Sequence, residues 1–202
     1  MLKAKIAVLV SGGGTNLQAL IDAQKQGIIK NGEIKLVISN NKEAYALQRA
    51  KQNGIKTEVV IKHKGMQAEF ESEINSLIEK NEIDIIVLAG FMCILSENFT
   101  SKYPERIINV HPSLIPSFCG KGFYGLHVHE AALQYGVKVT GATVHFVNEI
   151  PDGGKIIMQK AVPIKPSDTP ELLQRRVMEK AEWIILPKSV EKVCRELVKE
   201  KK

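Results

Sequence analysis

The chain has 202 residues, a length that suits one domain with a substantial hydrophobic core. Apolar residues make up 44% and charged residues 25% of it, which is ordinary globular usage and excludes a wholly disordered chain. The three cysteines, Cys93, Cys119 and Cys194, are too few and too scattered for a disulfide framework and suggest a cytoplasmic protein.

The net charge of +6 raises the question of nucleic-acid binding. Only five of the 28 basic residues are arginine, whereas nucleic-acid recognition favours clustered arginine with interleaved aromatics. Residues 188–202 contribute half of the excess, as a basic C-terminal helix or solvated tail. We therefore expect no nucleic-acid partner. The chain has no apolar run long enough for a transmembrane span and no secretory signal, so we expect no membrane partner either.

Short apolar runs alternate with helical patterns along the first half of the chain. The runs predict buried strands at residues 6–10, 34–38, 59–61 and 83–89. Helical stripes between them contain Leu17, Leu20 and Ile21, and then Phe70, Ile74, Leu77 and Ile78. Asn53-Gly54 indicates the end of the helix before the third strand. Repeated strand–helix–strand units predict a parallel sheet with helices on both faces.

The second half of the chain predicts one more parallel strand and an antiparallel hairpin. A strand, a Pro/Gly/Ser-rich loop, a helix and two longer strands are expected at residues 107–111, 112–125, 127–135, 137–147 and 155–162. The turn signal Pro151-Asp152-Gly153-Gly154 joins the last two strands, which favours their antiparallel pairing. The apolar alternation slips near Gly141, where we expect a β-bulge.

A last helix is predicted after Thr169, which has the character of an N-cap with Pro170 at the first helical position. Pro187 is expected to break or kink this helix before its last turns. No repeat or linker interrupts the chain, so the sequence predicts a single α/β domain.

A glycine-rich segment, Ser11-Gly-Gly-Gly-Thr-Asn16, lies between the first strand and the first helix. Glycines let a backbone approach an anion, and free N–H groups at a helix start attract one. Leu17 stands where the dinucleotide motif GxGxxG needs its third glycine, and the Walker A lysine is missing. The segment therefore predicts a small phosphate site. The alternative is a tight turn capped by Thr15 or Asn16.

Asn109 and His111 are two residues apart on a predicted strand, so their side chains point to the same face. They lie near the carboxyl end of the strand, where open α/β sheets bind ligands. Histidine can act as an acid near neutral pH, and an amide can donate to an oxyanion. A pair of satisfied polar residues at a strand end is the alternative. The following Ile115–Pro116 bond is a candidate for a cis peptide.

Asp152 lies in the Asp-Gly turn, which is so favourable for a hairpin that the residue by itself indicates only a turn. His145 is a possible partner for Asp152, although its position alone favours a half-buried strand histidine. His127 and His129 form an HxH pair, but no spacing typical of zinc ligands accompanies them, so we expect no metal.

An apolar segment, Leu88-Ala-Gly-Phe-Met-Cys-Ile-Leu-Ser96, follows the fourth predicted strand directly. At the carboxyl edge of the sheet it could form a flat pocket for an aromatic ligand. The alternative is that it covers the core where the chain turns, and the pattern does not decide between the two.

Six segments in this order resemble those of the phosphoribosylglycinamide formyltransferase (glycinamide ribonucleotide transformylase) family of folate-dependent enzymes: SGGGTNLQALI, ISN, LAGFMCILS, NVHPSLIP, TGATVHFV and DGGKII. The similarity runs from the first strand to Pro187. It implies a Rossmann-like, mostly parallel twisted sheet with an antiparallel hairpin. The implied single domain spans residues 1–202, with a phosphate-binding half (1–105), a catalytic half (106–187) and the basic segment 188–202.

The resemblance implies transfer of a formyl group from 10-formyltetrahydrofolate, as co-substrate, to the amine of N1-(5-phospho-D-ribosyl)glycinamide, without a metal. The implied products are formylglycinamide ribonucleotide and tetrahydrofolate, in de novo purine biosynthesis. Asn109, His111 and Asp152 match the catalytic residues of the family. By the same resemblance the ribonucleotide contacts are Gly14, Thr15, Asn16 and Glu182, and the folate contacts are Gln67, Met92, Cys93, Ile94, Leu95 and Asn109.

In the implied chemistry the amine attacks the formyl carbon and creates an anionic oxygen. Asn109 and His111 would donate hydrogen bonds to that oxygen, and His111 would pass a proton to the leaving folate nitrogen. Asp152 is expected to favour the charged imidazole and raise the pKa of His111. Members of the family often carry arginine where this chain has Cys93, and some members carry a folate-contacting arginine where it has Gln67. By this resemblance the chain has less positive charge near the folate tail.

Two other formyl-folate enzymes are the nearest alternatives. Methionyl-tRNA formyltransferase adds a C-terminal domain and formyltetrahydrofolate hydrolase adds an N-terminal one, and the length of 202 residues is expected to exclude both. A non-catalytic phosphoribosyl- or folate-binding protein would not need Asn109, His111 and Asp152 together. The expected partners are small molecules, and the sequence leaves open whether the protein is a monomer or a homodimer.

Overall fold

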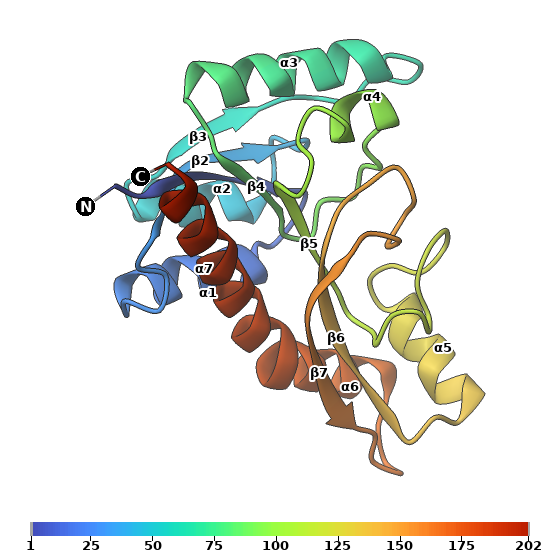
Figure 1. The fold of residues 1–202 in the computed structure, drawn as a ribbon. Helices are drawn as coiled ribbons and strands as arrows, with labels where there is room; N and C mark the ends of the chain where they lie inside the picture. Colours follow the sequence, from blue (N-terminus) through green and yellow to red (C-terminus); the bar gives the residue numbers. More distant parts are fainter. Residues whose placement is uncertain (1, 202) are drawn as a thin grey trace.

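The computed structural model describes residues 2–201, so the two terminal residues of the expected 1–202 domain lie outside it. A seven-stranded sheet in the order β3-β2-β1-β4-β5-β6-β7 forms its centre (Figure 1). The parallel strands are β1 (Ala4–Val10), β2 (Gly32–Ser39), β3 (Lys56–Val59), β4 (Ile85–Leu88) and β5 (Ile107–His111). An antiparallel pair, β6 (Val139–Phe146) and β7 (Ile156–Pro163), extends the sheet from β5. The predicted α/β fold class is confirmed.

Helices cover both faces of the sheet, as Figure 1 shows for α1 and α7 on one side and α3 on the other. The first face packs against α1 (Thr15–Lys25), α2 (Tyr45–Gln52), α6 (Pro170–Val177), a π-helical turn η1 (Met178–Glu182) and α7 (Trp183–Glu200). The second face packs against α3 (Gln67–Lys80) and α4 (Glu97–Thr100). Along β1, Ile6 and Val8 contact the first layer and Ala7 and Leu9 the second, because side chains alternate across a strand.

The third strand and the predicted bulge lie elsewhere than expected. The apolar run 59–61 begins where β3 ends, because β3 is an edge strand paired only with β2 and does not need apolar residues throughout. The pairing of β6 with β7 shifts register between Val144 and His145, not at Gly141. A Cβ atom at Gly141 would come within 2.1 Å of the Lys160 carbonyl oxygen, so this glycine permits the close approach of β7.

The C-terminal helix also differs from expectation. Pro187 lies inside α7 and does not break it. Trp183, whose carbonyl the proline ring would crowd, has a ψ of −10° at the end of η1, away from the helical value. Over its described residues, 188–201, the C-terminal segment is not a solvated tail, since Val190, Val193 and Cys194 are buried in the core. Its charges lie on the opposite, solvent-facing side of an amphipathic helix.

Several local expectations are confirmed. Asn53 caps α2, and α5 spans His127–Tyr135. Thr169 Oγ1 accepts a hydrogen bond from the Leu172 N–H at 3.3 Å at the start of α6. The Ile115–Pro116 peptide is cis. Between residues 2 and 201 we find no helix with the length and apolarity of a bilayer-spanning segment.

Candidate active site

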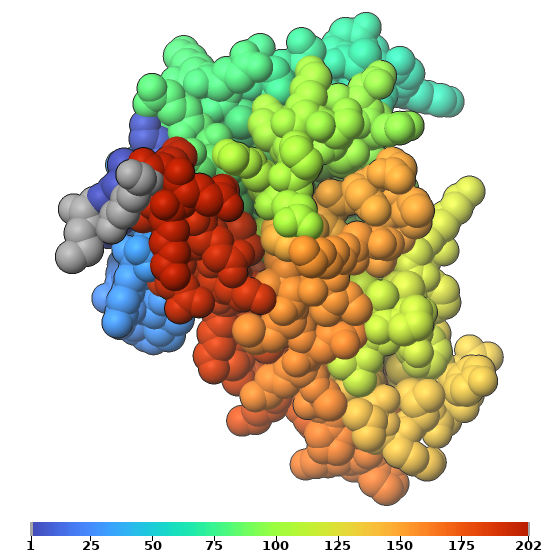
Figure 2. Space-filling view, in the orientation of Figure 1, coloured from blue at the N-terminus to red at the C-terminus, as the bar shows by residue number. Residues whose placement is uncertain are grey.

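A cleft of about 850 Å³ opens at the carboxyl ends of the parallel strands β1, β4 and β5. Residues at the start of α1, the apolar segment after β4, the end of β5, the loop 120–125 and the turn 147–152 line it. Figure 2 shows the segment near residue 95 (green) beside the segment near residue 150 (orange) at the surface. Three loops that follow neighbouring strands therefore converge on one hollow, as expected for an open α/β sheet.

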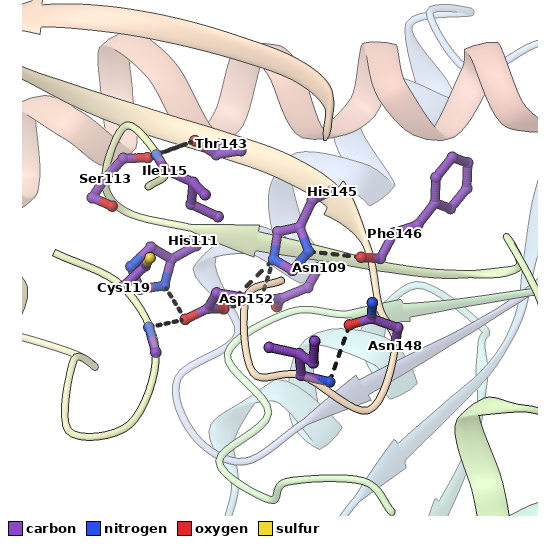
Figure 3. A network of polar contacts seen from close by, with 12 residues as sticks. Asn109, His111, Ser113, Ile115, Cys119, Thr143, His145, Phe146, Asn148 and Asp152 are labelled. Carbon is purple, nitrogen blue, oxygen red and sulfur yellow. Dashed lines mark hydrogen bonds and ion pairs between the residues drawn. The ribbon is translucent and has the colours of Figure 1, made fainter. Parts of the chain in front are cut away.

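Asn109, His111 and Asp152 lie together in this cleft (Figure 3). Nδ1 of His111 is 3.4 Å from Asp152 Oδ2, and Nδ2 of Asn109 donates to Asp152 Oδ1 at 3.5 Å. Asp152 adopts a φ of +56° in the turn between β6 and β7, and the Gly120 N–H donates to its carboxylate at 2.9 Å. Asn109 and His111 reach the same carboxylate because both point to one face of β5.

His145 is a fourth member of this network and is almost fully buried, not half-buried as the sequence favoured. Its Nδ1 faces the Phe146 carbonyl oxygen at 2.8 Å, and a carbonyl only accepts, so Nδ1 carries the hydrogen. In the neutral ring Nε2 then accepts from Asn109 Nδ2, 3.2 Å away. His145 thereby orients the amide of Asn109. The pairing of Asn109 with His145 across β5 and β6 is a non-local feature that short-range patterns do not reveal.

The ring of His111 faces an acceptor on each side, since its Nε2 lies 2.8 Å from the Phe118 carbonyl oxygen. Burial lowers the pKa of His111 below its ordinary value, although the Asp152 carboxylate and the Phe118 carbonyl act to raise it. Asp152 therefore acts on the pKa of His111 in the expected direction. The expectation that this pKa is raised is nevertheless wrong, because the effect of burial is larger. Burial would raise the pKa of Asp152, but the neighbouring His145 and His111 side chains hold it below its ordinary value.

The start of α1 has no side-chain cap from any residue between 2 and 201. Gly14 is the N-cap in a left-handed conformation, with φ +72°, so the expected alternative of a cap by Thr15 or Asn16 is wrong. Asn16 Nδ2 instead donates to Glu182 Oε2 at 2.7 Å, and both residues line the cleft. Burial raises the pKa of Glu182 to about 7, while the bond from Asn16 acts to lower it. Gly14 and Thr15 are not among the lining residues.

The apolar segment after β4 fits both of its interpretations. Leu95 is buried in the core, whereas Met92 and Ile94 are more than half exposed and line the cleft together with Cys93. Gln67, by contrast, does not line the cleft. Its Nε2 donates to the Ile94 carbonyl oxygen at 3.1 Å, so in this structure Gln67 holds the backbone of the segment without lining the cleft.

The HxH histidines do not converge on a metal site. His127 is exposed and pairs with Glu130 at 2.9 Å, whereas His129 is fully buried and lines the cleft. Over the described part of the chain, no group of three His, Cys, Asp or Glu side chains could hold a metal ion.

Sequence reasoning missed several further lining residues, among them Lys121, Gln174 and Met178. Gln174 and Met178 precede Glu182 at four-residue intervals, so the helical spacing could have indicated a shared face. Lys121 stands between two glycines in a loop, where no periodic signal exists.

A formyl transferase family model matches residues 4–190. A phosphoribosylglycinamide formyltransferase of Haemophilus influenzae is 44% identical over 184 residues, which cover 91% of this chain and 84% of the relative. The trifunctional purine biosynthetic protein adenosine-3 of Homo sapiens is 46% identical over 95% of this chain, which spans only 18% of that protein. Among solved structures, glycinamide ribonucleotide transformylase 1 of Symbiobacterium toebii has a TM-score of 0.88 at 37% identity, covering 96% of this chain and 89% of that one.

Proposed function

This chain belongs to the formyl transferase family, and from that premise we propose that it transfers a formyl group from 10-formyltetrahydrofolate to the amine of N1-(5-phospho-D-ribosyl)glycinamide. The products are formylglycinamide ribonucleotide and tetrahydrofolate, in purine biosynthesis. One observation carries the proposal: a single cleft holds Asn16 and Glu182, the Asn109–His111–Asp152 network and the apolar residues 92–95. These three groups suit a phosphorylated amine, a group-transfer reaction and a pterin.

The two substrates occupy opposite parts of the cleft in this proposal. The ribonucleotide phosphate lies at the uncapped N–H groups of Gly14, Thr15 and Asn16, where the α1 dipole favours an anion. Glu182 accepts hydrogen bonds from the ribonucleotide. The folate lies against Met92 and its apolar neighbours, two of which are exposed and free to pack on a flat ring.

The remaining folate contacts of the proposal are Cys93, Ile94 and Leu95 from the same segment, with Gln67 behind it. The proposed reaction needs no metal. One domain carries both halves of the site, the phosphate-binding half over residues 1–105 and the catalytic half over residues 106–187.

Asn109, His111 and Asp152 perform the chemistry in the proposal. The substrate amine attacks the formyl carbon, and the carbonyl oxygen becomes an anion. Asn109 donates to that anion with the hydrogen now in the long, 3.5 Å contact to Asp152, while His145 holds the rest of the amide in place. His111 in its charged form donates a second hydrogen bond, and Asp152 stabilises that charge. When the oxyanion collapses and the bond to the folate nitrogen breaks, His111 delivers its proton to that nitrogen, and the proton that the attacking amine loses returns to the imidazole.

The test is a turnover assay with purified protein and both substrates, following loss of the formyl donor by absorbance. We expect turnover that requires glycinamide ribonucleotide. Donor loss without any acceptor would indicate a hydrolase, and transfer to initiator methionyl-tRNA would indicate a tRNA formyltransferase. If the folded protein shows no turnover, the proposal is wrong.

A further inference from the structure

The carbonyl oxygens of four consecutive loop residues, 11–14, all accept hydrogen bonds. Two of the donors come from α2. The Ala46 backbone N–H donates to the Gly12 carbonyl at 3.0 Å, and Arg49 Nε donates to the Gly13 carbonyl at 2.8 Å. The other two donors are a side chain after β2 and the first hydrogen-bonded turn of α1. Helix α2 therefore holds the carbonyl side of the glycine loop, at Gly12 and Gly13.

The N–H groups of the same loop are free. Within residues 2–201, no acceptor pairs with the N–H of Gly12, Gly13, Gly14 or Thr15. In a trans peptide the C=O and the following N–H point in opposite directions. Since the Gly12 and Gly13 carbonyls point toward α2, the N–H groups of Gly13 and Gly14 point away from it. Such outward N–H groups at a helix start are the donors that bind an anion.

A second observation at this helix start also indicates a ligand. Asn16 is 9% exposed and lines the cleft, and its Oδ1 has no hydrogen-bond partner in the described chain. Its Nδ2 is committed to Glu182, so the amide cannot rotate to satisfy the oxygen without losing that bond. The unpaired Oδ1 suits a hydroxyl donor such as that of a ribose.

Arg49 is itself held in place. Its Nη1 donates to Gln18 Oε1 at 3.3 Å on α1, and its guanidinium lies over the Tyr45 ring at 5.0 Å. It does not line the main cleft, and across residues 2–201 no carboxylate pairs with it. A planar guanidinium fixed at three points can orient a peptide group more firmly than a flexible side chain can.

We propose that Arg49 is a positioning residue for the ribonucleotide phosphate. It fixes the Gly13 carbonyl, keeps the Gly14 N–H directed at the phosphate, and adds an uncompensated positive charge behind the loop. The inference rests on the proposed function, because it assigns Arg49 a role at the phosphate position of that substrate.

The kinetic test compares Arg49→Met with Lys51→Met, which removes a charge from the same helix without touching the loop. We expect Arg49→Met to raise the KM for glycinamide ribonucleotide about tenfold or more, with kcat nearly unchanged. The reason is that the Gly14 N–H is held less firmly toward the phosphate and the positive charge of Arg49 is lost. Lys51→Met should leave KM unchanged. With glycinamide riboside, which lacks the phosphate, Arg49→Met and wild type should have equal KM.

In this kinetic comparison, each of three results would overturn the inference: an unchanged KM in Arg49→Met, the same rise with the riboside, or the same rise in Lys51→Met. Arg49→Lys keeps the charge without the fork, so we expect it to recover only part of the loss. A wild-type KM in Arg49→Lys would show that Arg49 acts through its charge alone, and would also overturn its role as a positioning residue. If Arg49→Met does not fold, Arg49→Gln takes its place with the same expected direction.

A binding measurement separates this inference from the proposed function. Ribose 5-phosphate is the probe, titrated calorimetrically into wild type, Arg49→Met and Lys51→Met. Weaker binding by Arg49→Met alone supports the inference even if the wild-type chain transfers no formyl group. Equal affinity in all three proteins, or no binding by wild type, overturns it.

Discussion

His111 lies between two acceptors, the Phe118 carbonyl and the Asp152 carboxylate, and only its charged form can donate to both. The burial that lowers the pKa of His111 also excludes water from around its ring. A proton donor of this kind is easily deprotonated, which suits transfer to a leaving nitrogen near neutral pH.

Replacing His111 by asparagine removes the proposed proton donor and keeps a polar side chain. We expect His111→Asn to lower kcat roughly a hundredfold, within the usual range for a lost general acid. The KM for the ribonucleotide should change little, because its phosphate and hydroxyl contacts lie at the start of α1. Steady-state kinetics check this, with His127→Asn, an exposed histidine outside the cleft, as the control. Wild-type kcat in His111→Asn would contradict the assignment.

Asp152 acts to raise the pKa of His111 against the effect of burial. Asp152→Asn removes that contribution, so the pKa of His111 should fall further and the charged form should be rarer at neutral pH. The limb of the kcat/KM profile that reports His111 should move to lower pH, as should its ring titration by NMR. Glu149→Gln, which neutralises another carboxylate of the cleft, is the control. An unchanged profile in Asp152→Asn, or an equal shift in the control, would contradict the coupling.

At the scale of elements, the local signals predicted most of the fold. Strand β5 and helix α5 have the expected bounds, because a short β-branched run and an apolar stripe specify them locally. Strand β3 differs because its exposure at the sheet edge depends on its neighbours. The predicted break at Pro187 is wrong because the turn before it adjusts its backbone. The position of β3 depends on strand pairing, whereas Pro187 is accommodated by the backbone of the turn that precedes it.

Gly141 gives the hairpin a testable property. Because an alanine Cβ there would meet the Lys160 carbonyl and the Leu114 side chain, the β6–β7 pairing must open to accept it. We expect Gly141→Ala to reduce the free energy of unfolding by about 2–3 kcal/mol, the usual cost of overpacking. Urea titrations measure the loss. Gly12→Ala, whose Cβ would meet no atom within 4 Å, should lose far less. Equal losses would show that close approach is not the function of Gly141.

The candidate site was predictable only in pieces. The spacing of Asn109 and His111 places them on one face of a strand, which is a local property. The bond between Asn16 and Glu182 joins residues 166 positions apart, and His145 meets Asn109 only through strand pairing. The roles of Asp152 and Glu182 came from resemblance, because an Asp-Gly turn and a helical glutamate carry no chemical signal alone.

At the scale of the whole molecule, two buried groups respond to pH in opposite directions. Burial lowers the pKa of His129 to about 4, so acidification from its unfolded pKa of about 6.5 weakens the folded state. Burial raises the pKa of Glu182 to about 7, so acidification toward its unfolded pKa of about 4.3 strengthens the folded state. His111, with its lowered pKa, acts in the same direction as His129. The site thus carries groups whose effects on stability partly cancel below neutral pH.

Single substitutions should reveal the two opposing slopes. Each group alone changes the free energy of unfolding by about 1.4 kcal/mol per pH unit, or about 2 kcal/mol between about pH 6.5 and 5. Glu182→Gln should therefore lose about 2 kcal/mol more than wild type over that interval, and His129→Leu about 2 kcal/mol less. His129→Leu should fold well, because neither ring nitrogen of His129 has a partner in the described chain. Urea unfolding at both pH values measures the slopes, and parallel pH dependence in the three proteins would show that neither group titrates as its burial requires.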